Sequence, residues 1–432
     1  MEKVYQHYLK SRKVTIDSRN CPAGSIYFAL KGERFNGNDF ARDALAKGCE
    51  LAVVDEVALK NEEGCVWVPD ALVALQQFAA HHRQTTGVQV VGITGSNGKT
   101  TTKELLAQVL SKKYRIWFTQ GNLNNHIGVP LTLLSMPEGT ELVVVEMGAN
   151  HLGEIAELCE ISQPDCGLIT NVGKAHIEGF GSVEGVKTGK GELYRYLNQH
   201  DLPVFVNWDN DHLKEMLGNA CERAFKYGSG EASDVNGDGA LVAPFLSFSW
   251  RRRGAGETHA VKTQLTGMYN LENALAAVAV GVFYKVADSD ISEAISTYQP
   301  ANHRSQIIDT GNNKVILDAY NANPSSMAVA LDNFSAVEAT KRVVILGGMK
   351  ELGVESEEEH RTLIHRLLQL QVDLCFLIGP EFKQLLPQKQ GWFWFESCLS
   401  LISHIKAHPI QQALILVKGS RANQLEKVME AL

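Results

Sequence analysis

Short apolar runs alternate with longer helical stretches through the middle of the chain. The predicted strands are Val88–Thr94, Leu142–Met147, Gly167–Val172 and Pro203–Asn207. The predicted helices include Thr101–Leu110 and Gly153–Cys159. Continuous apolar strands that alternate with helices are typical of a parallel sheet covered by helices on both faces. The pattern therefore predicts a central α/β domain with a mostly parallel sheet.

A second alternating series follows Pro300. Its predicted strands, which end in polar or glycine-rich residues, are Lys314–Asp318, Arg342–Leu346, Asp373–Ile378 and Ala413–Val417. Open α/β sheets bind ligands at the carboxyl ends of their strands. We therefore expect this series and the central one to contribute the two walls of a shared cleft.

The N-terminal part has shorter apolar pieces. The predicted strands are Ser25–Leu30, Leu51–Val54 and Cys65–Val68, and the helix that follows them is Ala71–His82. The polar segment His81–Gly87 is then interpreted as a linker. A chain of 432 residues exceeds what one hydrophobic core usually supports. We therefore predict three α/β domains, over residues 1–85, 86–300 and 301–432.

Composition and charge narrow the classes of function. The net charge is −8 and the isoelectric point is near 6.0, which argues against a nucleic-acid partner or a polybasic membrane binder. The N-terminus carries no apolar signal region, and no run of about 18 apolar residues could span a membrane. The eight cysteines lack the close spacings of metal or disulfide frameworks. We expect a cytoplasmic monomer that acts on small molecules.

The segment from Val90 to Thr102 predicts a nucleotide site. A strand leads into a glycine-rich turn and a helix, which contain Gly95, Ser96, Asn97, Gly98, Lys99, Thr100 and Thr101. The glycines let backbone N–H groups face a polyphosphate, and the helix N-terminus adds its dipole. The lysine supplies charge to the β- and γ-phosphates, and the hydroxyl of Thr100 can bind magnesium. The spacing is not the standard G-x-x-x-x-G-K-[ST], because Ile93 stands at the first glycine position.

Two other strand ends carry side chains that suit a metal ion. Glu146 ends an apolar strand, where a buried carboxylate needs a partner, and magnesium prefers oxygen ligands. The alternative is a carboxylate in contact with solvent. His176 follows another strand end, where an isolated histidine is more often structural than a ligand. The residues alone leave both roles open.

A series of short motifs runs through nearly the whole chain. They are Asp17-Ser18-Arg19, Gly24 to Gly32, the glycine-rich turn, Gly121 to Thr132, Val145 to His151, Ile169 to His176, Gly267 to Ala274, Asp318 to Pro324, and Lys418 to Arg421. In this order they resemble the Mur ligase family. The sequence departs from the family at Tyr269, where histidine is usual, and at Asn36-Gly37-Asn38, where Asp-Gly-His is more frequent.

The resemblance implies an ATP-dependent ligase that acts on a UDP-linked cell-wall precursor. The last two motifs are most similar to the members that add D-alanyl-D-alanine to UDP-N-acetylmuramoyl-tripeptide. Such a member has a small α/β domain for the UDP precursor, a central ATPase domain and a Rossmann-like C-terminal domain. It uses two magnesium ions and a lysine carbamylated by carbon dioxide.

The resemblance also implies roles for individual residues. Lys99, Lys190, His176 and Arg304 match catalytic residues, and the residues that match magnesium ligands are Thr100, Glu146, His176 and Lys190. A helix lysine taken alone is normally exposed, and Lys187 lies three residues away. Lys190 is preferred because it begins the Lys-Gly-Glu-Leu motif. The residues that match the precursor site are Ser18, Arg19, Lys31, Asn124 and Asn125.

The remaining candidates surround the predicted nucleotide. Asn270 and Asn273 share a helix face, so Asn270 can cap the helix while Asn273 contacts the nucleotide. Arg304 can reach the phosphates as a planar cation, and Asp318 resembles an acceptor for ribose hydroxyls. Either the nucleotide or the dipeptide can be positioned by Tyr320, Asn321 and Asn323.

The expected reaction has two steps, and three alternatives compete with it. The tripeptide carboxylate attacks the γ-phosphate, and the amine of D-alanyl-D-alanine then attacks the acyl phosphate. A ligase for the third peptide residue is disfavoured because no Asp-Asn-Pro-Arg motif is present, and a folate polyglutamate ligase by the Asp17-Ser18-Arg19 domain. The alternatives from other classes are a nucleotide switch without ligation and a small-molecule kinase.

Overall fold

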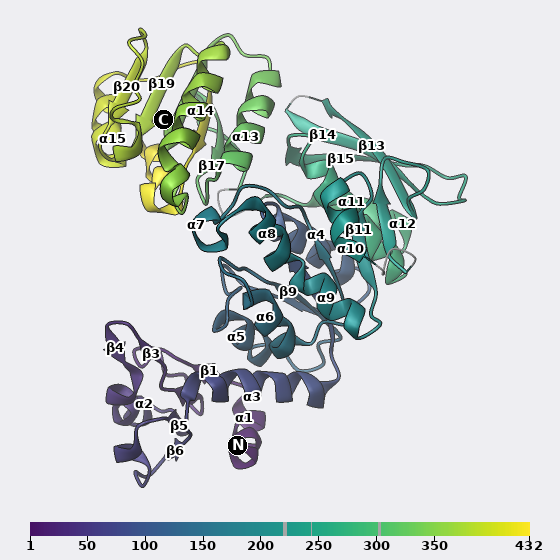
Figure 1. The fold of residues 1–432 in the computed structure, drawn as a ribbon, viewed down its shortest axis with the longest axis vertical. Helices are drawn as coiled ribbons and strands as arrows, with labels where there is room; N and C mark the ends of the chain where they lie inside the picture. Colours follow the sequence, from purple (N-terminus) through teal and green to yellow (C-terminus); the bar gives the residue numbers. More distant parts are fainter. Residues whose placement is uncertain (219–222, 243, 301–303) are drawn as a thin grey trace.

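The computed structural model describes residues 1–218, 223–242, 244–300 and 304–432. They form three units, each built on a β-sheet of its own (Figure 1). The N-terminal unit lies at the lower left of the view, the central unit in the middle and the C-terminal unit at the upper left. The predicted class, three α/β domains, is confirmed. Cys221 lies outside the described residues.

The N-terminal unit has a small parallel sheet in the order β1-β2-β5-β6. These strands are Val14–Thr15, Ile26–Phe28, Leu51–Val54 and Cys65–Trp67. A two-stranded ribbon is formed by β3 and β4, Lys31–Gly32 and Phe35–Asn36. The helices of this unit are α1 (Glu2–Ser11), η1 (Gly37–Phe40), α2 (Ala41–Ala46) and η2 (Val57–Leu59).

Helix α3 (Ala71–Thr86) joins the N-terminal unit to the central unit. The prediction of a linker over His81–Gly87 is wrong, because the helix continues to Thr86 and only Gly87 lies beyond it. His82 is fully buried, and its Nδ1 lies 2.9 Å from the hydroxyl oxygen of Tyr5. Polar residue types alone could not reveal that this helix end is covered.

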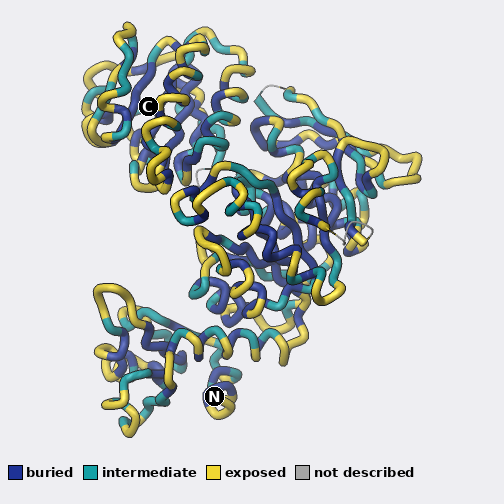
Figure 2. Tube along the Cα trace, in the orientation of Figure 1, coloured by how far each residue is buried: buried dark blue, intermediate teal, exposed yellow. Residues whose placement is uncertain are grey.

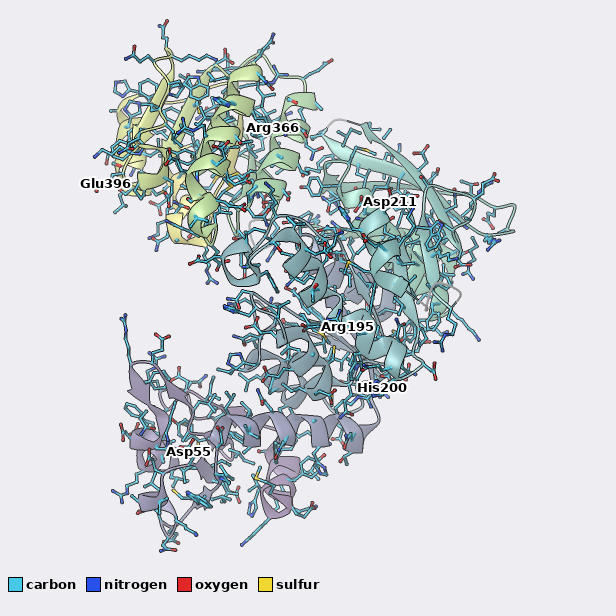
Figure 3. The ribbon with its side chains drawn as sticks, viewed as in Figure 1. Asp55, Arg195, His200, Asp211, Arg366 and Glu396 are labelled. Atoms are coloured by element: carbon cyan, nitrogen blue, oxygen red, sulfur yellow. The ribbon has the colours of Figure 1, made fainter. Side chains whose placement is uncertain are left out.

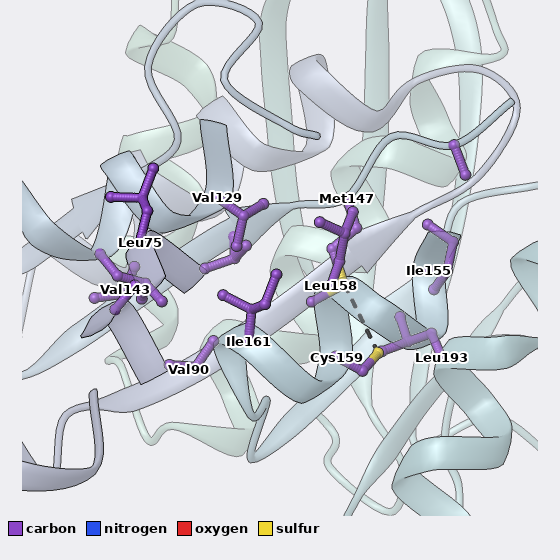
Figure 4. Packing of buried hydrophobic residues seen from close by; sticks show 14 of the residues in the cluster. Leu75, Val90, Val129, Val143, Met147, Ile155, Leu158, Cys159, Ile161 and Leu193 are labelled. Atoms are coloured by element: carbon purple, nitrogen blue, oxygen red, sulfur yellow. Dashed lines mark hydrogen bonds between the residues drawn. The ribbon is translucent and has the colours of Figure 1, made fainter. Parts of the chain in front are cut away.

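The same helix packs on the central unit. Leu75 belongs to a buried cluster that includes Val90, Val129 and Val143 of the central unit (Figure 4). Deeper in that cluster the sulfur atoms of Cys159 and Met147 lie 4.0 Å apart. One hydrophobic core therefore continues from the N-terminal unit into the central unit.

The central sheet has nine strands in the order β15-β14-β13-β12-β11-β10-β7-β9-β8. The parallel strands are β7 (Gln89–Thr94), β8 (Ile116–Phe118), β9 (Leu142–Glu146), β10 (Cys166–Ile169), β11 (Val204–Asn207) and β12 (Phe225–Gly228). The antiparallel edge consists of β13 (Val235–Val242), β14 (Phe245–Arg252) and β15 (His259–Thr266). The predicted parallel sheet is confirmed, with a mixed edge that was not predicted.

The helices of the central unit cover both faces of this sheet (Figure 1). They are α4 (Lys99–Ser111), α5 (Gly128–Leu134), α6 (Glu154–Ser162), α7 (Ile177–Phe180), α8 (Val183–Lys190), α9 (Glu192–Gln199), α10 (Asp211–Leu217), α11 (Asn270–Phe283) and α12 (Asp288–Thr297). The strands between them are dark blue in Figure 2, which marks them as buried. Burial on both faces explains why these strands have continuous apolar sequences.

The C-terminal unit has a six-stranded sheet in the order β16-β17-β21-β18-β19-β20. Its strands are Gln306–Asp309, Lys314–Asp318, Leu414–Lys418, Arg342–Gly347, Leu374–Ile378 and Trp392–Phe395, in that spatial order. Only the β16–β17 pair among them is antiparallel. The helices are α13 (Pro324–Ala336), α14 (Ser356–Gln369) and α15 (Cys398–Ala407), with short turns η4 (Gly353–Glu355), η5 (Pro380–Phe382), η6 (Arg421–Asn423) and η7 (Leu425–Ala431).

None of the described helices has the length and apolar character needed to cross a membrane.

Asn38, at one of the departures from the family pattern, has a structural role. Its side chain is buried. The amide nitrogen donates to Asn36 Oδ1 (2.8 Å) and Asp55 Oδ1 (2.7 Å), and the amide oxygen accepts from the backbone N–H groups of Asp55 and Glu56. Asp55 is labelled in Figure 3, in the N-terminal unit. This asparagine therefore connects the end of β5 to the turn after β4.

Replacing Asn38 with alanine should destabilise the N-terminal unit by about 1–3 kcal/mol, because buried partners would lose their hydrogen bonds. Hydrogen exchange followed by mass spectrometry checks this, and faster exchange is expected in β2 and β5. The matched control is alanine at the exposed Asn61 of the same unit. Equal exchange in the two variants would contradict the structural role.

Candidate active site

A cavity of about 970 Å³ lies between the central and C-terminal units. Most of the residues predicted to act in catalysis or binding line it: Ser96, Asn97, Gly98, Lys99, Thr100, Thr101, Asn124, Asn125, Glu146, His176, Asn273, Arg304, Asp318, Tyr320, Asn321 and Asn323. They come from the carboxyl ends of β7, β9, β10 and β17 and from neighbouring loops. The predicted candidates that do not line it are Gly95, Lys190, Asn270, Ser18, Arg19 and Lys31.

The turn after β7 requires glycine at two positions. Gly95 has φ 141° and Gly98 has φ 80°, both in the region that favours glycine. A Cβ atom on Gly98 would also lie 2.5 Å from Oδ1 of Asn273, and one on Gly95 would overlap the hydroxyl of Thr170. The turn therefore packs tightly against α11 and against the end of β10.

Residues that follow β10 hold this turn in place. The backbone N–H of Asn97 donates to Asn171 Oδ1 at 3.0 Å, and that of Ser96 donates to the carbonyl of Asn171 at 2.9 Å. Lys99 folds back over the turn, with Nζ donating to the carbonyl oxygens of Gly95 (2.7 Å) and Ser96 (3.3 Å). Burial lowers the pKa of Lys99. The ammonium group is thus already held at the mouth of the predicted phosphate site.

Glu146 has several polar partners at the end of β9. Its Oε2 accepts from the hydroxyl of Thr100 at 2.9 Å, and its Oε1 accepts from Nδ2 of Asn124 at 2.9 Å. Nζ of Lys103 lies 3.5 Å from Oε2, and both side chains are fully buried. Burial alone would raise the pKa of Glu146, but the ammonium groups of Lys103 and Lys99 hold it below its usual value. The carboxylate is therefore ionised and faces Thr100.

The alternative of a solvated acid at Glu146 is wrong, since the residue is 2% exposed. Lys103 was not recognised from the sequence. Its spacing from Thr100 places both on one face of α4, but no sequence signal shows that this lysine is buried against a strand end 43 residues away.

His176 contacts the C-terminal unit. Its Nδ1 forms an ion pair with Oε2 of Glu351, which lies in the loop after β18. Contact with the imidazole lowers the pKa of Glu351. Nearby, Nζ of Lys174 lies 2.5 Å from Oε1 of Glu359, and Asn323 donates to Asn97 Oδ1 at 2.9 Å. These contacts close the C-terminal unit against the loops that hold the predicted phosphate site.

Lys190 is buried beneath the cavity, so the expectation of an exposed helix lysine is wrong. Its Nζ donates to the carbonyl of Ala149 at 2.8 Å and lies 5.1 Å from the ring centre of Phe180. Burial and then the charge of Lys99 lower the pKa of Lys190 well below its usual value. Its neighbour Lys187 instead contacts surface acids, with 3.0 Å to Glu215.

Asn270 does not cap its helix, although the sequence predicted that it would. Asn270 is the first residue of α11, and its Nδ2 donates to the carbonyl of Thr266 at 2.8 Å instead of capping the helix. Its Oδ1 accepts from Nδ2 of Asn273 at 2.8 Å. Asn273 also accepts from the hydroxyl of Thr102 at 3.1 Å. Asn270 thus orients Asn273, which alone of the two reaches the cavity.

The C-terminal wall contains an ion pair and a cation–π pair. Nζ of Lys418 lies 2.6 Å from Oδ2 of Asp318 and also donates to the carbonyl of Asn321 at 3.2 Å. The guanidinium carbon of Arg304 lies 4.0 Å from the ring centre of Tyr320. Asn323 caps α13 in a reciprocal pair with Ser326. The role of Lys418 as the partner of Asp318 was not predicted.

The N-terminal candidates form a separate group. Nε and Nη2 of Arg19 each lie 2.9 Å from a different oxygen of Asp17. The carbonyl of Ser18 accepts from Lys47, and Lys31 pairs with Asp55. In Figure 3 the side chains of this unit stand apart from those of the C-terminal unit. The structure therefore does not bring Ser18, Arg19 and Lys31 to the cavity.

The site offers oxygen ligands to a metal ion, although its acidic side chains are spread around the cavity. Within the described ranges, no three His, Cys, Asp or Glu side chains cluster as a metal site. The hydroxyl of Thr100 and the carboxylate of Glu146 lie together beside Lys99. This pair fits magnesium, which usually keeps several waters and shares its shell with substrate phosphates.

Comparison with known proteins gives a consistent result along the chain. Models described as "Mur ligase family, catalytic domain", "Mur ligase middle domain" and "Mur ligase, glutamate ligase domain" match residues 10–109, 93–281 and 303–421. The UDP-N-acetylmuramoyl-tripeptide–D-alanyl-D-alanine ligases of Bacillus subtilis and Escherichia coli are each 33% identical to this chain. Each match covers 97% of this chain, and 92% and 93% of the two relatives.

Two solved structures resemble the fold closely. MurF from Acinetobacter baumannii is 33% identical with a TM-score of 0.87, covering 97% of this chain and 92% of that one. The MurF ligase from Thermotoga maritima in complex with ADP is 26% identical with a TM-score of 0.86, covering 98% and 97%. Sequence identity at this level over nearly the full length, together with the three units and the motif order, shows that this chain belongs to the Mur ligase family.

Proposed function

We propose that this chain is an ATP-dependent ligase that joins D-alanyl-D-alanine to UDP-N-acetylmuramoyl-tripeptide, giving the pentapeptide precursor of peptidoglycan. The observation that carries the proposal is the cavity in which Lys99, Thr100 and Glu146 face residues of the C-terminal unit. The similarity to two UDP-N-acetylmuramoyl-tripeptide–D-alanyl-D-alanine ligases over 97% of the chain supports the choice of substrates. The reaction would take place in the cytoplasm, with the chain acting as a monomer.

In this proposal the chain binds ATP at the turn after β7. Lys99 binds the β- and γ-phosphates, while Asn273 and Arg304 approach from α11 and from the start of the C-terminal unit. Asp318 can accept from a ribose hydroxyl, although Lys418 holds one of its oxygens. The similarity to an ADP-bound relative supports nucleotide binding here.

Two magnesium ions are part of the proposal. Thr100 and Glu146 would hold the first, and His176 and a carbamylated Lys190 would hold the second. Bound magnesium would neutralise negative charge that develops on the phosphoryl group. The low pKa of Lys190 supports carbamylation, because only an uncharged amine can attack carbon dioxide. Because Glu351 contacts Nδ1 of His176, the metal would bind through Nε2 of the same ring.

The chain's own residues position both substrates. Ser18, Arg19 and Lys31 hold the UDP end of the precursor, and Asn124 and Asn125 line the cavity where its tripeptide carboxylate meets the γ-phosphate. That carboxylate displaces ADP and becomes an acyl phosphate. The dipeptide amine then attacks the acyl carbon and phosphate leaves. Closure of the C-terminal unit excludes water from the acyl phosphate.

The proposal predicts that phosphate release requires both the UDP-sugar-tripeptide and D-alanyl-D-alanine. A coupled phosphate assay checks this, with the new amide identified by mass spectrometry across a panel of tripeptide precursors. Equal phosphate release without either substrate would instead support a nucleotide switch. A stable phosphorylated product without an amide would support a kinase.

A further inference from the structure

Four lysines and arginines line the cavity in the described part of the chain: Lys99, Arg304, Lys418 and Arg421. Two of them have assigned partners. Lys99 folds over the phosphate turn, and Lys418 is buried against Asp318. The two arginines remain, and both stand beside the ring of Tyr320, at 4.0 Å for Arg304 and 5.7 Å for Arg421.

The two arginines differ in their relation to the phosphate turn. Arg304 acts on the turn directly, because its charge lowers the pKa of both Lys99 and Glu146, after the larger effects of burial and of other charges. Arg421 follows the end of β21, beside Tyr320, which follows the end of β17. These two strands are parallel neighbours, with Lys418 opposite Asp318. The ring of Tyr320 thus lies beside both arginines.

Arg421 has no anionic partner in the part of the chain that the structure describes. Its side chain is exposed and contacts the ring of Tyr320. The acids that line the cavity already contact other groups of the protein: Glu146, Glu154, Glu157, Glu272, Asp318 and Glu351. A permanently charged fork of five N–H donors therefore faces the cavity with capacity to bind a carboxylate or phosphate.

We propose, on the basis of the function proposed above, that Arg421 binds the C-terminal carboxylate of the incoming dipeptide. The dipeptide must present its amine at the acyl phosphate beside Lys99, so its carboxylate lies at the far end. An extended dipeptide spans about 7 Å, so its carboxylate needs a receptor away from the turn, and Arg421 is a cation that lines the same cavity. The planar guanidinium binds a carboxylate through two parallel hydrogen bonds.

This assignment also distinguishes the nucleotide from the dipeptide as the ligand of the residues that follow β17 and β21. The nucleotide phosphates bind at the turn, where Lys99 and Arg304 act. Arg421 and the exposed face of Tyr320 then belong to the dipeptide. The free carboxylate becomes a required feature of the acceptor, so that an acceptor with a neutral C-terminus binds poorly.

The test compares D-alanyl-D-alanine with its neutral analogue D-alanyl-D-alaninamide as acceptors, in the full-length enzyme. The wild type should show a KM roughly 10- to 100-fold higher for the amide, as expected for loss of a charge-assisted pair. Arg421→Ala should raise the KM for the free acid by a similar factor. It should treat acid and amide alike and leave the KM for ATP and for the precursor within about twofold.

Two further variants make the result specific. Arg421→Lys keeps the charge but loses the planar fork, so its KM for the free acid should be intermediate. Arg361→Ala removes an exposed arginine of the same unit that pairs with Glu357, and it should behave as the wild type. A general folding defect would change the KM values of all three substrates.

The outcomes distinguish this inference from the proposed function. If the wild type forms no amide with D-alanyl-D-alanine, the proposed function is wrong. If ligation occurs but Arg421→Ala still prefers the free acid as strongly as the wild type, the role of Arg421 is wrong. A raised KM for ATP in place of the dipeptide would likewise overturn it and assign the arginine to the nucleotide.

Discussion

Replacing Lys99 with alanine is expected to lower kcat by about 10³-fold or more, because it removes a preorganised cation from a phosphoryl group that gains charge in the transition state. The ammonium is already held over the turn by the carbonyls of Gly95 and Ser96, so little reorganisation accompanies catalysis. Steady-state phosphate release with saturating substrates checks the expectation. The spacing of the turn is not the standard one, which makes this a direct test of the loop assignment.

The matched control for this variant is Lys112→Ala. Lys112 caps the same helix at its other end, and its Nζ lies 3.0 Å from Glu293 at the surface. Its loss should leave turnover within about twofold, since an exposed ion pair contributes little. Near-normal turnover in Lys99→Ala as well would show that the turn does not bind the transferred phosphate.

The second large effect is expected at Lys190. Lys190→Ala should lose about 10²- to 10³-fold in kcat, if its carbamate is a charged ligand in the transition state. Added formate or acetate should restore part of the activity by entering the space left below Ala149. Removal of dissolved carbon dioxide should slow the wild type but not the rescued variant. Activity of the wild type and the variant, measured with and without added carboxylic acid and with and without dissolved carbon dioxide, checks the carbamate directly.

Lys187→Ala provides the comparison, because this lysine lies three residues away and pairs with Glu184 and Glu215 at the surface. It should be as active as the wild type and should not respond to acetate. A fully active Lys190→Ala variant would refute the carbamate. A variant whose loss no carboxylic acid restores would show that the buried lysine supports the fold beneath the cavity instead.

The strands that shape the cavity were predicted closely because burial on both faces leaves a clear pattern. Leu51–Val54 and Lys314–Asp318 coincide with β5 and β17, and the ends of the other predicted strands differ by at most a few residues. The antiparallel edge over 235–266 was missed. One face of β14 is only partly buried, so apolar residues alternate there with polar ones and no continuous run appears.

The candidate site was predicted where a polar residue ends a buried strand, and missed where a lysine is buried by a distant partner. Glu146 and Asp318 are examples of the first kind. Lys103 and Lys418 are examples of the second, since each is buried by a carboxylate that only the fold brings near. Lys190 was identified by resemblance alone, because residue type and helix position both favour an exposed lysine.

Helix α3 is a stiff spacer that sets the distance between the N-terminal and the central unit. Its 16 residues span about 24 Å, and one hydrophobic core fastens it to both the N-terminal and the central unit. A flexible tether would spread the far end of a bound precursor through a large volume and dilute it at the reaction centre. A stiff spacer instead fixes the gap that the precursor has to bridge. In the proposed reaction, a peptide one residue too short would end about 3.5 Å short of the phosphate. The fixed spacing between the units therefore selects the length of the precursor's peptide.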